Sequence, residues 1–270
     1  MGQVNVLLAA GPLLSASSRW LGGGGGAVGP HSRCDDALLP WDTDGEYGGL
    51  CASYYVQDIP RREHVPIVFV HGNTVDASVW LPAMEWFLDR GDTGEDLWAI
   101  TFRRRSPSHE EMATQLDDFV AEVRAATGHD TVNVVAHSLG VTGVRYWLAR
   151  RDRYDWVDAV VGLAGANHGS ALCRYFSRAG ITFGPGRPNW FLNPDNLEDP
   201  DHPLAALNRN ETPGDVDYYT IRATQDRFFR ENPESPALEG AVNEQVATDH
   251  RGLLTAEPVF ERLSEWLRGS

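Results

Sequence analysis

The sequence contains no lysine, so all 23 of its basic residues are arginine. They stand against 38 Asp and Glu residues, which gives a formal net charge of -15 at pH 7. Nucleic-acid phosphates and anionic lipid surfaces attract basic patches, so neither is an expected partner for this chain. The same balance fits a halophilic protein, because salt screens repulsion between carboxylates, although a GC-rich genome also favours arginine over lysine.

Cysteine is scarce as well. Three cysteines are too few for a disulfide framework, and two interpretations stay open. Cys34 and Cys51 form one bridge with Cys173 left over, or all three are reduced thiols. No CxxC pair or spaced Cys/His set is present, so we expect no metal site, and no motif calls for an organic cofactor.

Long apolar runs are missing too. No run approaches the ~18 residues that a membrane-spanning helix needs. The opening "MGQVNVLLAAGPLLSASS" has no early arginine and is interrupted by Asn5 and Pro12, unlike a secretory signal. A cytoplasmic location is therefore favoured, with secretion as the alternative.

A glycine run, "LGGGGGAVGP", occupies residues 21–30. Glycine loses much conformational entropy on folding, so this segment reads as a linker. It follows no strand and lacks the spaced glycine and lysine of a phosphate-binding loop, which is the rival interpretation. We therefore predict a flexible extension over residues 1–33 and one domain over residues 34–270.

Short apolar runs alternate with helical patterns from Val65 onward, which predicts an α/β fold with a mostly parallel sheet covered on both faces. The expected strands lie near residues 65–72, 97–102, 131–136, 158–165, 217–223 and 244–248. We expect helices over residues 78–88, from Ser108 to near Gly128, over residues 140–150, and after Pro258. The second of these helices begins with a capping box, Ser108 and Glu111.

The stretch "TVNVVAHSLGVTGV" combines a strand, a sharp turn at Ser138 and a helix. This is the setting of a nucleophile elbow, in which a strained serine projects its hydroxyl above the sheet. Strand and helix nearly touch there, so the residues two before and two after the serine must be small. Ala136 and Gly140 meet that need, and we predict Ser138 as the catalytic nucleophile; a serine in a buried strand is the alternative.

A serine nucleophile needs a base and a carboxylate that orients the base, in the chain order Ser, acid, His. Asp226 follows the strand over residues 217–223 at the sheet edge where ligands bind, whereas its rival Asp217 lies at the entrance of that strand. His250 lies in the last loop, where the base of such a triad belongs. His168, in "GANHGS", is the less favoured alternative base.

The oxyanion that forms during acyl transfer needs two N–H donors. Leu139 supplies one, directly after the nucleophile at the start of its helix. Asn73 supplies the other from the "VHGN" loop, where Gly72 permits a tight turn. The alternative is that this loop is only a turn.

Together, "FVHGN", "AHSLG", "GANHGS", "NETPGDVDYYTIRATQD" and "DHRGLL" resemble the bacterial class 2 lipases of the α/β-hydrolase superfamily, to which polyhydroxyalkanoate depolymerases are related. The similarity covers the chain from about Val65 to the C-terminus. The resemblance implies an α/β-hydrolase fold, a Ser138, Asp226 and His250 triad, and an oxyanion hole at Asn73 and Leu139. Alanine at the position of Ala136 is common in such families.

Residues 171–214 are long for a loop and rich in proline and aromatics, which is typical of a lid. Their aromatic side chains either line an apolar acyl pocket or simply cover the end of the sheet. The three arginines at 103–105 are expected to form ion pairs, and the alternative is a site that attracts an acidic substrate. The stretch "EDPDHP" at 198–203 is expected to be a solvated acidic turn, and the alternative is a cation site.

These features predict a serine hydrolase that cleaves carboxylic esters of small-molecule or lipid-like substrates through an acyl-enzyme. One alternative is a polyhydroxyalkanoate depolymerase with the same triad. The other is a catalytically silent α/β-hydrolase that serves as a binding module.

Overall fold

The computed structural model describes residues 48–51, 64–181 and 187–269. The predicted glycine linker and Cys34 lie outside the described residues, and so does the side chain of Cys51. The flexible extension and the Cys34–Cys51 bridge therefore stay predictions. Cys173 is a free thiol.

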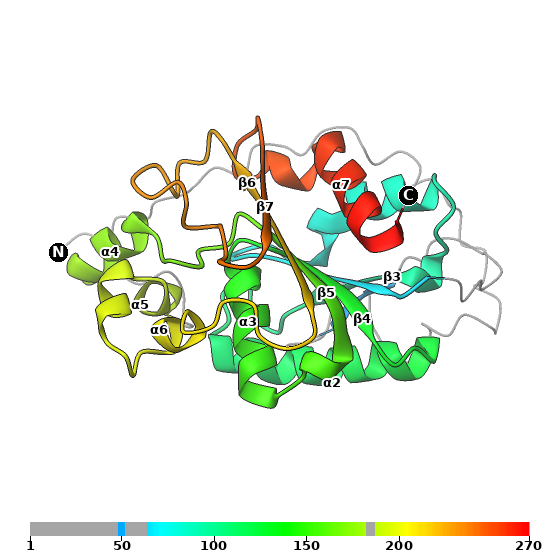
Figure 1. Ribbon diagram of the computed structural model, residues 1–270, viewed down its shortest axis with the longest axis horizontal. Coiled ribbons are helices and arrows are strands. Elements are labelled where there is room, and N and C mark those ends of the chain that lie inside the picture. Colours follow the sequence, from blue (N-terminus) through cyan, green and yellow to red (C-terminus); the bar gives the residue numbers. More distant parts are fainter. Residues whose placement is uncertain (1–47, 52–63, 182–186, 270) are drawn as a thin grey trace.

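A seven-stranded sheet forms the centre of the molecule, with the order β1-β3-β2-β4-β5-β6-β7 (Figure 1). The edge strand β1 is antiparallel to β3, and every other neighbouring pair is parallel. The strands are β1 (Gly48–Cys51), β2 (Ile67–Val70), β3 (Leu97–Thr101), β4 (Val132–His137), β5 (Val157–Leu163), β6 (Asp217–Ala223) and β7 (Val242–Val246).

Helices cover both faces of the sheet (Figure 1). On one face lie α1 (Leu81–Leu88) and α7 (Glu257–Arg268), joined by packing of Trp86 against Phe260. On the other lie α2 (His109–Thr127) and α3 (Leu139–Arg151). A third group gathers at one end: α4 (Ala171–Arg178), α5 (Pro188–Phe191) and α6 (Pro203–Leu207). Short 3-10 helices are η2 (Ala77–Trp80), η3 (Gly94–Asp96), η4 (Tyr154–Trp156), η5 (Pro194–Glu198) and η6 (Gly252–Leu254).

The inner strands β2, β3 and β4 are buried at every residue. Helices on both faces exclude water from both sides of these strands, which explains why their sequences are apolar runs and not alternating patterns. At the outer end, β7 is mostly exposed. The fold is thus the predicted one, a mostly parallel sheet between two helical layers.

Several predicted elements differ in their bounds; for example, the strand predicted over residues 65–72 covers only Ile67–Val70. The helix predicted over residues 78–88 is split, because η2 precedes α1 and Pro82 stands in the first turn of α1. Pro82 has no N–H to donate and tolerates only that position of a helix. The last strand lies two residues earlier than predicted, at Val242–Val246.

Among the described residues, no helix is both long and apolar enough to cross a membrane.

The start of α2 is fixed by the predicted capping box. The Ser108 hydroxyl accepts a hydrogen bond from the N–H of Glu111, and the Glu111 carboxylate accepts one from the N–H of Ser108 at 2.8 Å. At the other end Gly128 adopts φ 75°, a left-handed conformation that favours glycine.

We predict that Ser108→Ala lowers the free energy of unfolding by about 1 kcal/mol, because it removes the acceptor for one N–H of the first turn. Urea denaturation measures the difference. Glu122→Ala, an exposed change within the same helix, is the control and should alter stability by less than about 0.5 kcal/mol. Equal effects of the two substitutions would contradict the capping role.

Candidate active site

Ser138 joins the end of β4 to the start of α3. Its backbone has φ 56° and ψ -122°, in a region that residues with a side chain rarely adopt. The N–H of Ser138 donates to the carbonyl of Leu163 at 2.8 Å, which ties the turn to the end of β5. The predicted elbow is therefore present, with its strained serine at the carboxyl edge of the sheet.

The small residues on either side of the elbow are needed for close packing. A Cβ on Gly140 would lie 2.6 Å from the carbonyl oxygen of His71, so no side chain fits there. Ala136 is fully buried on β4, between Val70 of β2 and Gly162 of β5. The methyl group of Ala136 fits in this space, so the elbow forms with alanine here as it would with glycine.

Ser138, His250 and Asp226 form one hydrogen-bonded relay. The Nε2 atom of His250 lies 2.9 Å from the Ser138 hydroxyl oxygen, and its Nδ1 atom lies 2.6 Å from Asp226 Oδ2. The other carboxylate oxygen, Oδ1, accepts the N–H of Phe228 at 2.9 Å. The Asp226 side chain is only 4% exposed, so these bonds replace the water that would otherwise solvate its charge.

The rival residues lie elsewhere. Asp217 is the first residue of β6, at the opposite edge of the sheet from the relay. His168 bonds Glu211 at 2.7 Å through Nε2 and the carbonyl of Ser235 at 3.2 Å through Nδ1, so both of its ring nitrogens are engaged away from Ser138.

The "VHGN" loop packs directly against the elbow. A Cβ on Gly72 would lie 3.0 Å from the Ser138 Cβ, so the backbone of Gly72 passes close to the serine. Asn73 is the next residue of the loop. Leu139 is the first residue of α3, and its N–H has no acceptor within the described part of the chain, as expected for the first turn of a helix. The positive end of the helix dipole also points at this spot.

Two buried histidines hold the site in place, a role that the sequence reasoning missed. The Nε2–H of His137 donates to the carbonyl of His250 at 2.9 Å. The Nδ1–H of His71 donates to the Gly72 carbonyl at 2.7 Å, and its Nε2 accepts the N–H of Phe102 at 3.2 Å. His137 precedes the predicted nucleophile Ser138, and His71 lies two residues before Asn73, and this proximity in the sequence was the available signal.

Burial keeps these histidines neutral. It lowers the pKa of His137 to about 3, with the neighbouring His250 as a smaller cause. It also lowers the pKa of His71 to about 4. Neutral rings suit their bonding, because each donates through one nitrogen to a carbonyl oxygen.

Phe228 is a further neighbour of the relay that was not predicted. Its ring lies 4.5 Å from the ring of His250, centroid to centroid, and 44% of the residue is exposed. The carbonyl of Phe228 accepts the Ser170 hydroxyl at 2.7 Å, which connects the acid loop to the beginning of α4. The insertion over residues 171–214 therefore borders the site.

The aromatic residues of that insertion do not all face the relay. Phe191 stacks on His109 of α2, with 3.3 Å between ring centroids, and meets Tyr146 of α3 edge to face. Trp190 is 52% exposed and touches His202. Phe191 thus covers helices α2 and α3, whereas the second interpretation expected these aromatics to cover the end of the sheet.

Arg104 and Arg105 form ion pairs with nearby carboxylates, as the default interpretation expects. Arg104 lies 3.7 Å from Glu111, and Arg105 lies 3.8 Å from Asp76. In the "EDPDHP" turn, Asp199 accepts the N–H of Asp201. Within the described ranges, no group of three or more His, Cys, Asp or Glu residues is arranged to hold a metal ion.

Comparison with known proteins adds independent findings. The model of the family described as Lipase (class 2) matches residues 64–183, a little under half of the chain. The mature lipase BlEst2 of Bacillus licheniformis superposes with a TM-score of 0.61 at 17% identity, covering 81% of this chain and 98% of that one. Lipase B of Aspergillus fumigatus gives 0.58 at 14%, covering 76% of this chain and 52% of that one.

A carboxylesterase structure of the thaumarchaeon Nitrososphaera gargenis also matches, with a TM-score of 0.53 at 11% identity over 86% of this chain and 97% of that one. The sheet order, the elbow and these neighbours show an α/β-hydrolase fold. Over residues 64–183 its sequence is similar to the class 2 lipase family.

Two glycine-to-alanine substitutions in α3 test the close packing at the elbow. Gly140→Ala sets a Cβ against the backbone oxygens of His71 and Val70, which cannot move without shifting the loop before Asn73. Gly143→Ala, one turn later in α3, meets only the flexible end of Met112. If Asn73 is the oxyanion donor that the sequence predicts, the first lowers kcat for ester hydrolysis about 100-fold by displacing that donor, and the second has little effect. Equal kcat values for the two variants would contradict this geometry.

Buried neutral histidines also predict acid sensitivity. The pKa of His71, His109 and His137 is lowered from 6.5 to between about 3 and 4, so the unfolded chain binds more protons as the pH falls. Below pH 6.5, and until the folded-state pKa is reached, each histidine lowers the free energy of unfolding by about 1.4 kcal/mol per pH unit. Denaturation at pH 7.5, 6.5 and 5.5 measures this slope. His109→Gln should reduce it, and an unchanged slope in that variant would rule out the proposed cause.

Proposed function

We propose that the protein is a serine hydrolase that cleaves carboxylic esters through an acyl-enzyme, with Ser138 as nucleophile, His250 as base and Asp226 as the orienting carboxylate. The observation that supports this most is the continuous relay from Ser138 through His250 to Asp226, with distances of 2.9 and 2.6 Å. A serine hydroxyl is a weak nucleophile at neutral pH, and this arrangement is the one that activates it.

In the first step, His250 Nε2 takes the hydroxyl proton while the Ser138 oxygen bonds to the ester carbonyl carbon. The electron pair of the carbonyl moves onto its oxygen, and the N–H groups of Leu139 and Asn73 stabilise the resulting oxyanion. Asp226 stays ionised, accepts the Nδ1–H of His250 and stabilises the imidazolium.

In the second step, the oxyanion collapses and the bond to the leaving alcohol breaks. The alcohol oxygen takes the proton held by His250 Nε2, and the acyl group remains on Ser138. Water then repeats the sequence: His250 removes its proton, the water oxygen bonds to the acyl carbon, and the carboxylic acid leaves as Ser138 regains its proton.

His137 and His71 act in this scheme as positioning residues. His137 holds the backbone of His250 through its carbonyl, and His71 shapes the loop that carries Asn73. Because both rings are buried and neutral, they place no competing positive charge beside the imidazolium of His250.

A small or lipid-like ester is the proposed substrate class. Phe228 offers an exposed apolar surface directly beside His250, where the leaving group of an ester lies during proton transfer. The formal charge of -15 disfavours nucleic acid as a partner. The same relay serves a polyester depolymerase, and activity on a polyhydroxyalkanoate film distinguishes that alternative from hydrolysis of monomeric esters alone.

The deciding experiment is labelling with a fluorophosphonate, read by intact mass, followed by turnover of a p-nitrophenyl ester at high and low salt. We expect one adduct on the wild type and on Ser108→Ala, the control, and none on Ser138→Ala. Asp226→Asn should keep the fold and lower kcat about 10⁴-fold, because the imidazole loses its orienting charge. A folded wild type that gives neither adduct nor turnover at either salt would favour the binding module.

A further inference from the structure

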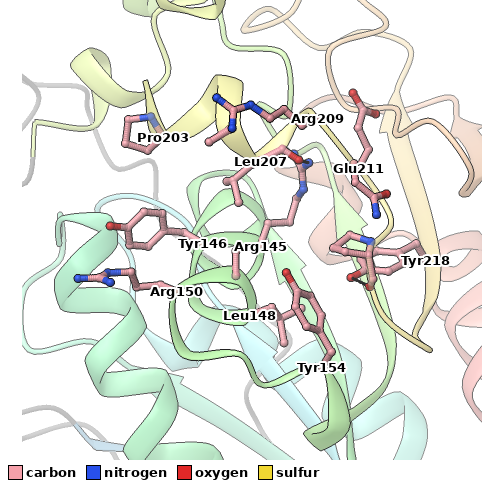
Figure 2. Close-up of a pocket in the computed structure, with 14 residues that line it drawn as sticks. Arg145, Tyr146, Leu148, Arg150, Tyr154, Pro203, Leu207, Arg209, Glu211 and Tyr218 are labelled. Atoms are coloured by element: carbon pink, nitrogen blue, oxygen red, sulfur yellow. Dashed lines mark hydrogen bonds between the residues drawn. The ribbon is translucent and has the colours of Figure 1, made fainter. Parts of the chain in front are cut away.

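A cavity of about 310 Å³ lies between the second half of α3 and the segment that leads from α6 to β6 (Figure 2). Its wall includes Arg145, Leu148, Tyr154, Ala206, Leu207 and Arg209. None of the relay residues Ser138, Asp226 and His250 lines it. The cavity is therefore separate from the candidate active site, although both are built on α3. Its size falls within the lower range, about 300 Å³ upward, of small-molecule pockets.

Arg145 contributes an unusual charge to this wall. The residue is only 4% exposed, and its guanidinium donates to neutral acceptors alone. These are Asn167 Oδ1 at 3.2 Å, the Leu207 carbonyl at 3.0 Å and Asn208 Oδ1 at 3.0 Å. No carboxylate among the described residues forms an ion pair with it. Burial lowers the pKa of Arg145 to about 10, and the nearby Glu211 carboxylate offsets part of that shift without forming an ion pair. Buried charges in proteins are usually paired, so the guanidinium can still take a direct anionic partner.

The other charged groups of the wall leave its net charge positive. Arg150 is neutralised by Glu110 at 3.5 Å. Glu211, the one acidic residue of the wall, already bonds His168 at 2.7 Å, and its carboxylate holds the pKa of His168 above the ordinary value. Glu211 also acts on Arg145 from beyond ion-pair distance, so it offsets one of the two remaining arginine charges and leaves the wall with a net positive charge.

Arg209 adds a second cation at the rim. It is exposed, and its guanidinium donates to the Pro200 carbonyl at 2.5 Å, with no ion pair to a described carboxylate. Two arginines that lack acidic partners thus face one cavity in a chain where 38 acidic residues outnumber 23 arginines.

Much of the remaining wall is apolar. Leu148 of α3 and Leu207 of α6 supply aliphatic surface, together with Ala206. Figure 2 shows the Tyr154 side chain reaching toward Arg145. The hydroxyls of Tyr146 and Tyr218 bond Glu110 and the Pro213 carbonyl, whereas the Tyr154 hydroxyl has no hydrogen-bond partner in the described part of the chain. A ligand that fills this space meets two guanidinium groups, one free phenol and aliphatic walls.

We propose that this cavity binds a small carboxylate with a compact apolar body. A guanidinium matches a carboxylate in shape, charge and donor spacing. The aliphatic wall favours an apolar tail over a bare inorganic anion, because such an anion leaves that surface uncovered.

The acid that ester hydrolysis releases is a ligand of this class. That link rests on the proposed function, whereas binding in the cavity does not depend on it. Ser138 begins the same helix that carries Arg145 and Leu148, so an occupant here contacts the helix of the nucleophile.

The test is calorimetric titration with octanoate and, as a neutral match, 1-octanol. The protein carries an alkyl phosphonate on Ser138, or is Ser138→Ala if no adduct forms, so that the candidate active site is blocked or inactive. We expect one octanoate site and weaker binding of octanol. Arg209→Ala should raise the Kd for octanoate about tenfold through loss of one charge-assisted contact, and Arg90→Ala, which removes an arginine beside α7, should not.

A second pair of variants tests the cavity itself. Ala206 is exposed at the wall, so Ala206→Phe fills the space without overpacking the core and should abolish octanoate binding. Ala205→Phe, on the adjacent residue of α6 outside the wall, should leave it intact. Equal Kd values for these two variants, equal affinity for octanol and octanoate, or no binding at all would each overturn the proposal. Saturable binding without ester turnover would support this site while rejecting the hydrolase.

Discussion

The close approach of two backbones at the elbow is the constraint on which the site depends. The carbonyl of His71 passes so near to α3 that a single Cβ on Gly140 would lie 2.6 Å from it. This contact brings the end of β2, the end of β4 and the start of α3 to one point. Ser138 takes its strained conformation at that point, and packing on all sides holds it there.

Burial then orders the polar groups around this point. Each ring nitrogen of His71 and the Nε2 of His137 has a backbone partner, so these histidines fix loops instead of exchanging protons. Asp226 uses both carboxylate oxygens, one for His250 and one for the N–H of Phe228. The relay is therefore supported by bonds to the main chain on both sides, which keeps its geometry without a bound ligand.

Two separate electrostatic environments result on one helix. At its start, α3 presents a free N–H and the positive end of its dipole next to Ser138. Two turns later, Arg145 places a full positive charge among neutral acceptors. Both regions suit negative charge: a transient oxyanion at the first and a carboxylate at the second.

The sequence by itself determined the sheet and the elbow, because apolar runs, the capping box at Ser108 and the small residues around Ser138 are local patterns with local causes. It also singled out Asp226 and His250, since a residue that follows a parallel strand must lie at the carboxyl edge of the sheet. Only the tertiary structure decided which nitrogen of His137 bonds His250, and that Phe191 covers α2. It alone leaves Arg145 without an acidic partner among the described residues. These features depend on contacts between residues far apart in the chain, and no local pattern encodes which distant partner a buried polar or aromatic side chain meets.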